Sequence, residues 1–153
     1  MASRASEPDR ATLEMVRLRR AELRQSMSAL EHALAEPAPI GHARWAGRVH
    51  VALVELSGDL REHIDITQGD AGLHRDLLAV APHLSGAVAR LNREHAQIQG
   101  LVDDLLARTS APEGDVDQIR RLGTTLLGVL VSHRQRGSDL LYEAYAFDVG
   151  GET

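Results

Sequence analysis

The sequence contains no cysteine and no lysine, and only 3% of its residues are aromatic. The lack of cysteine excludes disulfides, cysteine-ligated zinc sites and thiol catalysis. The scarcity of aromatic side chains argues against stacking surfaces for nucleic acids or sugars. The formal charge of −5 at pH 7 disfavours broad binding to nucleic acids or membrane surfaces, so neither is an expected partner.

Long hydrophobic runs are also missing from the chain. No stretch reaches the roughly 20 apolar residues of a membrane span, and the N-terminal MASRASEPDR lacks the apolar segment of a signal peptide. A cytoplasmic location is therefore expected. The length of 153 residues suits a single domain over 1–153, in which 1–10 and 149–153 are expected to fray.

Motifs for nucleotide binding, serine hydrolysis and metalloprotease chemistry are absent. The patterns G-x-x-x-x-G-K-[ST], G-x-S-x-G and H-E-x-x-H do not occur. No general base can be identified either, so catalysis is not the favoured function.

Proline and glycine divide the chain into four segments with helical periodicity. No window alternates as a β-strand does, and β-branched residues are sparse. The pattern predicts an all-α, up-down-up-down antiparallel four-helix bundle. The predicted helices are Pro8–Glu36, Gly41–Gln68, Leu73–Arg108 with a break at Pro82, and Val116–Phe147.

In three of these four helices, a histidine replaces an apolar residue on the line that faces the core. These residues are His63, His95 and His133. Because the last two helices fold back around a loop near Pro112, His95 and His133 are expected at similar depths. We therefore predict that these two histidines meet in the core and that His63 joins them.

The first helix has no histidine on its core line, although Arg20 lies there. His32 lies on the opposite face of that helix and is expected to face solvent, as are Arg134 and Arg136 in the last helix. Glu94 is expected to be solvated or to support a ligand rather than to bind metal itself. The remaining histidines are interpreted as surface or boundary residues: His42, His50, His74 and His83.

Two interpretations of the three core histidines remain open. Each imidazole could be neutral and hydrogen-bonded, with Thr67 and Ser132 as candidate partners. Alternatively, one metal ion could bind all three, since imidazole is a common nitrogen ligand for zinc and iron. Burying three imidazoles without partners is costly, and a metal would satisfy all three at once.

Three stretches of the sequence resemble the hemerythrin-like, or HHE cation-binding, domains. They are LREHIDIT (60–67), LNREHAQI (91–98) and VSHRQRGSDLLYEAY (131–145), within a resemblance that covers about residues 12–147. Members of that family are four-helix bundles with a non-haem di-iron centre. Their second helix carries L-x-x-H-x-x-x-E, their third an E-H pair and their fourth H-x-x-x-E.

The resemblance implies a ligand set with missing carboxylates. His63, His95 and His133 match the histidine ligands of the second, third and fourth helices. Thr67 stands where the family has a bridging glutamate, and Gly137 stands where it has its second carboxylate. Bridging carboxylates hold two mutually repelling irons together. A carboxylate-bridged di-iron site is therefore not expected.

The first-helix histidine of the family is also replaced, with Leu23 at its expected position. Three neutral histidines suit one divalent ion with an open coordination position, and a threonine is a weak ligand. The predicted metal ligands are His63, His95 and His133, with Thr67 as a further candidate, and iron or another divalent metal is the expected cofactor.

The family resemblance and the core histidines together predict sensing of oxygen, nitric oxide or redox state, or metal handling. Dioxygen and nitric oxide are then candidate ligands, and a homodimer is a candidate assembly. The alternative is a metal-free bundle that binds a partner or a small ligand. Gly137 either opens space beside His133 for a ligand or side chain, or only weakens the helix by roughly 1 kcal/mol.

Overall fold

The structure, a computed structural model, describes residues 10–70, 72–111 and 114–145, and all its regular elements are helical. Four long helices carry most of the chain. The elements are α2 (Arg10–Ala35), α3 (Ala43–Gln68), α4 (Leu73–Val80), the 3-10 turn η1 (Pro82–Leu84), α5 (Ser85–Ser110) and α6 (Val116–Tyr145). The prediction of an all-α protein with four long helices is confirmed for these residues.

Proline and glycine set the helix boundaries. Pro37 and Pro39 follow α2, where their rings prevent the helix from continuing. Gly41 begins the approach to α3 with a φ of 77°, in the left-handed region that favours glycine. Pro82 opens η1, a helix start at which its missing N–H is not needed. The break predicted at Pro82 is therefore confirmed.

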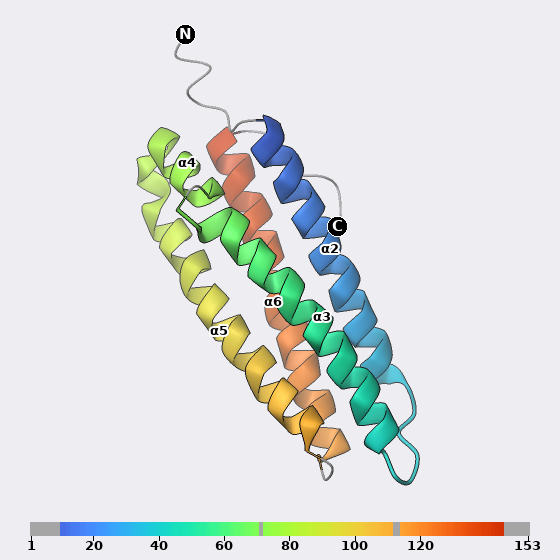
Figure 1. Ribbon diagram of the computed structural model, residues 1–153. Coiled ribbons are helices and arrows are strands. Elements are labelled where there is room, and N and C mark those ends of the chain that lie inside the picture. The colour runs from blue at the N-terminus through green and yellow to red at the C-terminus, as the bar shows by residue number, and fades with distance from the viewer. Residues whose placement is uncertain (1–9, 71, 112–113, 146–153) are drawn as a thin grey trace.

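The four long helices lie side by side along most of their length (Figure 1). α3 packs against α2 and α5, and α6 packs against α5 and α2. The connection 36–42, the end of α5 and the start of α6 lie at one end of the bundle, and α4 lies at the other, near the start of α2 and the end of α6. α4 thus closes the bundle at that end.

The core consists of two apolar clusters, one toward each end of the bundle. We call the larger one the leucine half; it draws on all four long helices. Its most deeply buried members are Leu23, Leu30, Val49, Leu53, Leu56, Ile98, Ile119, Leu126 and Leu130. The smaller cluster surrounds α4 and includes Val16, Leu73, Leu77, Leu84, Val88, Leu91, Leu140 and Leu141. We call this end, with the buried polar residues beside it, the histidine half.

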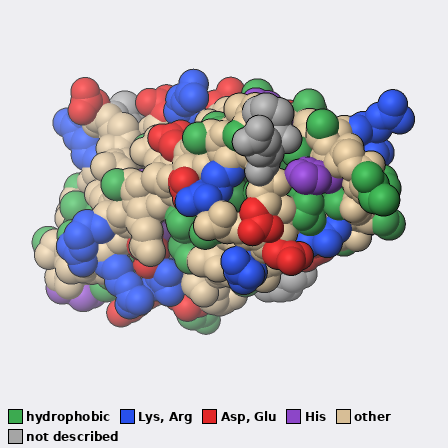
Figure 2. All heavy atoms as spheres, turned by 90° about the horizontal axis from the view of Figure 1, so that it is seen from below, with side chains coloured by type: hydrophobic (Ala, Val, Ile, Leu, Met, Phe, Trp, Pro, Cys, Tyr) green, Lys and Arg blue, Asp and Glu red, His purple; other side chains and the backbone are tan. Residues whose placement is uncertain are grey.

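Charge on the surface is mixed in sign. On the face seen in Figure 2, arginine and acidic side chains lie interspersed with hydrophobic ones. No helix among the described residues is long and apolar enough to cross a membrane. The predicted helix ends at Pro8 and Phe147 and the frayed ends at 1–9 and 149–153 lie outside the described residues, whereas Arg10 already belongs to α2.

Candidate metal centre

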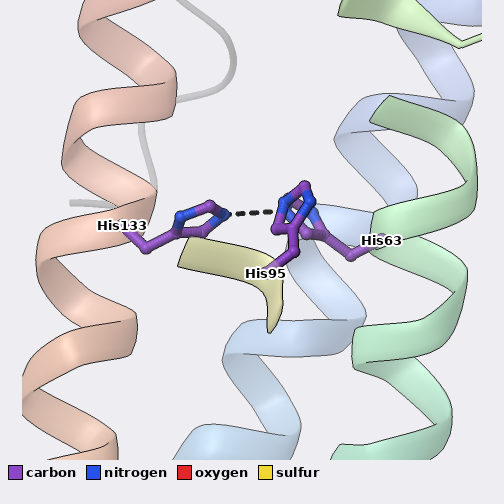
Figure 3. Close-up of side chains that lie close together, drawn as sticks. All are labelled: His63, His95 and His133. Atoms are coloured by element: carbon purple, nitrogen blue, oxygen red, sulfur yellow. Dashed lines mark hydrogen bonds between the residues drawn. The ribbon is translucent and has the colours of Figure 1, made fainter. Parts of the chain in front are cut away.

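Three histidines from three helices converge in the core, as predicted. His63 comes from α3, His95 from α5 and His133 from α6 (Figure 3). One ring nitrogen of each lies within 4.8 Å of the others. The residues are only 5%, 2% and 3% exposed. The structure thus brings three nitrogen donors to one buried point.

One pair of ring nitrogens is spaced like two ligands of one ion. His63 Nε2 and His133 Nε2 are 3.3 Å apart. Two nitrogens that each lie about 2.0–2.1 Å from a tetrahedral zinc ion are about 3.3 Å from each other. For both nitrogens to bind one ion, the proton that His63 Nε2 donates in this contact would have to move to His63 Nδ1.

Hydrogen bonds at Nδ1 orient two of the three rings. His133 Nδ1 donates to Glu94 Oε1 over 2.8 Å, and His95 Nδ1 donates to Gln68 Oε1 over 2.6 Å. Because carboxylate and amide oxygens only accept, both protons sit on Nδ1 and both Nε2 atoms carry lone pairs. This is the tautomer that a metal-binding histidine needs.

Two ring nitrogens of the cluster are buried without a hydrogen-bond partner among the described residues. They are His63 Nδ1 and His95 Nε2. Since the lone pair of His133 Nε2 accepts, His63 Nε2 donates to it, and His63 Nδ1 keeps its own lone pair. Buried polar atoms usually have partners, so such orphans mark a site that can take up a ligand.

Glu94 anchors the cluster on the side of His133. The residue is 7% exposed, and Arg136 Nη2 approaches its Oε2 to 2.6 Å while Arg90 lies 3.5 Å away. Burial alone would raise the pKa of Glu94, but the hydrogen bonds from His133 and Arg136 outweigh it and lower the pKa. The carboxylate is therefore ionised at neutral pH and makes His133 a better electron donor.

All three histidines are neutral at pH 7. Burial, reinforced by the neighbouring imidazoles, lowers the pKa of His63 well below its ordinary value and that of His95 to about 3. Burial also lowers the pKa of His133, although Glu94 opposes the effect. Neutral imidazoles keep the lone pairs that ligation of a metal ion requires.

A small cavity of about 20 Å³ adjoins the three histidines. That volume accommodates about one water molecule or an ion of similar size. Apart from apolar side chains, its walls comprise Arg20, His63, Thr67, His74, His95, His133 and Gly137. The centre therefore has an adjacent space for a small ligand.

The space beside Gly137 is shared with a buried arginine. Arg20 is 5% exposed, and its Nη2 donates to Ser138 Oγ over 2.7 Å. A Cβ added at Gly137 would lie 3.6 Å from Arg20 Nη1. Of the two interpretations of Gly137, the structure supports the open one, because both the cavity and a neighbouring side chain lie there.

Four other residues were named in the sequence analysis as possible partners or as matching family positions, and the structure places each of them. Thr67 lines the cavity, but its hydroxyl donates to the backbone oxygen of His63 over 2.8 Å. Ser132 is exposed, so the prediction that it could bond a core histidine is wrong. Leu23 packs in the leucine half. Glu94 was expected to be solvated or to support a ligand; it is buried and accepts a hydrogen bond from His133.

Two residues interpreted as peripheral are buried. His74 is 7% exposed, stacks parallel to His95 with ring centroids 6.2 Å apart, and places its Nδ1 2.7 Å from Asn92 Oδ1. Arg134 was expected to face solvent, yet it is 8% exposed and donates to the backbone oxygen of Arg20. The spacing of His74 before Leu77 is helical and could have indicated a shared buried face. No sequence signal identifies the partner of Arg134.

The other histidines lie at the surface or at its boundary, as expected. His32 and His83 are exposed. His42 and His50 are half-buried, and they form hydrogen bonds with the backbone oxygen of Gly114 and the hydroxyl of Thr109, respectively.

A second group of possible metal ligands lies nearer the surface. Glu22, Asp59 and Glu62 approach one another on α2 and α3. Arg19 pairs with both glutamates, and Ser26 bonds Asp59. These contacts account for the acidic group without an ion.

No family model matches the chain, and neither a curated protein nor a solved structure is significantly similar to it. The chemistry of the site therefore rests on its geometry.

Proposed function

We propose that the chain is a hemerythrin-like, up-down-up-down antiparallel bundle that binds one divalent transition-metal ion through His63, His95 and His133. The observation that carries this proposal is the convergence of three buried, neutral imidazoles, two of them oriented by hydrogen bonds at Nδ1. The connections at alternate ends of the bundle agree with the proposed topology. Sensing of oxygen, nitric oxide or redox state, or metal handling, is the corresponding role.

The donor set favours particular ions. Three imidazole nitrogens suit zinc, iron, copper, nickel or cobalt better than magnesium or calcium, which prefer oxygen ligands. No aspartate or glutamate is among the described residues that line the cavity. Two adjacent ions would lack a bridging carboxylate, so the proposed site holds one.

His63, His95 and His133 would hold the ion beside the cavity. An ion bound there supplies a Lewis-acidic or redox-active centre for a small ligand such as dioxygen or nitric oxide. Glu94 keeps the His133 ring in place, and Gln68 does the same for His95. The apolar walls formed by α4 and its neighbours limit the access of water.

Metal content is the direct test. Protein purified without a chelator or a histidine tag would be incubated separately with iron, zinc and manganese, followed by elemental analysis and thermal unfolding. We expect near-stoichiometric binding of at least one metal, lost in His63→Ala and His133→Ala. His32→Ala is the matched control, because His32 is exposed and should leave the metal content unchanged. Metal at 100 times its Kd should stabilise the fold by about 2.7 kcal/mol.

One observation favours the alternative of a metal-free bundle. Arg20 places a positive charge in the wall of the same cavity, which opposes a cation. In that case the histidines form a polar network that includes the 3.3 Å contact of His63 and His133, and the function is binding of a partner or small ligand. Absence of metal, with unchanged unfolding on addition of each ion, would establish this alternative.

A further inference from the structure

The outer face of α3 carries two exposed valines. Val51 and Val54 are 60% and 52% exposed, and they lie one turn apart on the side of the helix opposite its buried residues. α3 packs against α2 and α5, and it lies at the front of the bundle in Figure 1. The two side chains therefore form an apolar spot at the centre of a helix face that is turned to solvent.

A glycine lies on each side of this valine pair. Gly47 is four residues before Val51 and Gly58 is four residues after Val54, so all four share one face of the helix. Neither glycine has a positive φ, and a Cβ at either would meet nothing within 4 Å. No other exposed glycine among the described residues flanks a pair of exposed valines. Packing within the chain therefore does not explain two residues that weaken a helix interior relative to alanine.

The order of these four residues is the same in both directions along α3. The pattern Gly-x-x-x-Val-x-x-Val-x-x-x-Gly has its midpoint between positions 52 and 53. In two antiparallel α3 helices related by a two-fold axis at this midpoint, Val51 of one copy lies level with Val54 of the other, and Gly47 lies level with Gly58. Valines then meet at the centre, and the glycines let the two backbones approach closely at both ends.

Charged residues along one edge of this face attract one another in such a pair. Arg44 and Arg48 precede the midpoint, Glu55 and Glu62 follow it, and at 100° per residue all four lie on the same side of the valines. The two-fold axis sets this edge against itself in the reverse direction. At 1.5 Å per residue, Arg44 of one copy lies about 1.5 Å along the axis from Glu62 of the other, and Arg48 about 3 Å from Glu55.

These four side chains are available to a second copy. All four are exposed, and Arg44 and Glu55 form no ion pair among the described residues. Arg48 and Glu62 each have one partner in the same chain, but ion pairs between exposed side chains contribute little to stability. A parallel pair would instead place each charge beside the same residue of the second copy. The charges therefore favour the antiparallel arrangement.

We propose that the outer face of α3 is the interface of a homodimer, in which two copies of the chain pair their α3 helices antiparallel about a two-fold axis. A second copy fits this face because the face is complementary to itself in shape and in charge. One helix face buries little area, so the dimer is weak, with a Kd on the order of 10 μM. The interface lies over the leucine half and needs no metal, so it does not depend on the metal site proposed above.

Sedimentation velocity of the full chain, from about 1 to 500 μM, tests whether the dimer forms. Val51→Glu places a charge against Val54 of the second copy and should raise the Kd at least about tenfold. Leu18→Glu, at an apolar residue of α2 that is 49% exposed, is the matched control and should dimerise like the wild type. A wild type that stays monomeric throughout, or a dimer that Val51→Glu leaves unchanged, would overturn the interface.

Exchange of charges tests the contact between Arg48 and Glu55. Arg48→Glu alone and Glu55→Arg alone each place like charges together twice, so both should dimerise more weakly than the wild type. An equimolar mixture of the two variants should form a heterodimer, because the new glutamate of one chain faces the new arginine of the other. The native Arg48 and Glu55 face each other at the second contact. A mixture no more dimeric than either variant alone would contradict the proposed register.

Disulfide cross-linking tests the direction of the two helices. The chain contains no cysteine, so every disulfide joins introduced residues. Gly47→Cys mixed with Gly58→Cys should give a covalent dimer that contains one chain of each kind. Neither variant should cross-link with itself, because identical positions lie about 16 Å apart along the axis, beyond the reach of a disulfide. Absence of the mixed product, or preferential cross-linking of Gly47→Cys with itself, would overturn the antiparallel dimer.

Discussion

The two halves of the bundle are built from the same four long helices and the same spacing of core positions, but different residues fill those positions. In the leucine half, Leu23, Leu53 and Leu126 are completely buried and contact other apolar side chains. In the histidine half, the same core lines carry Arg20, His63, His95 and His133. The periodicity that sets the fold is therefore independent of the chemistry that each layer can perform.

The difference in core residues assigns the main contribution to stability to the leucine half and the proposed ligand binding to the histidine half. Burial of apolar side chains is the main favourable term in folding, so the leucine half stabilises the whole bundle. The histidine half buries charged and polar groups, and the described residues offer no hydrogen-bond partner to His63 Nδ1 or His95 Nε2. Such orphaned atoms lower stability unless a ligand satisfies them. Four predictions test this contrast, in order of decreasing effect.

The largest effect is expected in the leucine half. Leu53→Ala removes a side chain that is 0% exposed and leaves a cavity among tightly packed neighbours. The free energy of unfolding should fall by about 2–5 kcal/mol. Urea denaturation measures this change, and the metal content should stay that of the wild type. A loss below about 1 kcal/mol would contradict the assignment of stability to this half.

The second-largest effect is expected from acid, which should lower the free energy of unfolding through the histidine half. In the unfolded chain His95 has a pKa of about 6.5, whereas in the folded protein its pKa is about 3. Between these values the unfolded state binds a proton that the folded state does not, so stability falls as the pH decreases. The slope for one such group is about 1.4 kcal/mol per pH unit.

Urea denaturation of the metal-free wild type and His95→Leu across this pH window isolates the contribution of His95. The difference in unfolding free energy between the two proteins should change with pH, because only the wild type has this titrating group. A difference that stays constant would show that His95 is protonated in the folded state.

Loss of the carboxylate behind His133 should weaken metal binding. Glu94→Gln keeps the size of the side chain but removes the charge that polarises the ring. The affinity for the metal should fall about 10–100-fold. Competition with a chelator measures the change, and Glu62→Gln, at an exposed residue paired with Arg19, is the matched control. Equal affinities in Glu94→Gln and the wild type would exclude a supporting role for Glu94.

The smallest effect on stability is expected from His95→Leu without metal at neutral pH. The substitution replaces an imidazole that has one orphaned nitrogen with an apolar side chain of similar size. Replacing buried polar groups in this way is often neutral or stabilising. Thermal unfolding should therefore show an unchanged or slightly higher Tm, together with loss of metal binding. A marked drop in Tm would identify His95 as part of a stabilising network.

Much of the fold could be predicted from the positions of proline and glycine. The third segment shows this, because Pro82 cannot continue a helix, and the chain there divides into α4, η1 and α5. The depth of His63 was harder to predict, since α4 separates α3 from α5 in the sequence. The convergence was still predicted, because all three histidines lie on the apolar lines of their helices.

The partners of the site could not be predicted from helical periodicity. Glu94 lies about 100° around the helix from His95, yet it bonds His133 because α5 and α6 pack closely. The long side chain of Arg134 reaches across to the backbone of α2. Contacts of this kind depend on the rotation of each helix relative to its neighbours, which one helical pattern does not specify.

Gly123 and Gly137, both in α6, differ in the space that the structure leaves for a side chain. A Cβ at Gly123 would meet the end of the Leu34 side chain at 2.5 Å, so substitution there would force Leu34 to shift. At Gly137 the nearest such contact is 3.6 Å, to Arg20 Nη1, and the helix would gain by losing a glycine. Every glycine codon is a single base change from a codon for aspartate or glutamate. One base change in the codon for Gly137 can therefore place a carboxylate beside Arg20 and offset its charge in the cavity.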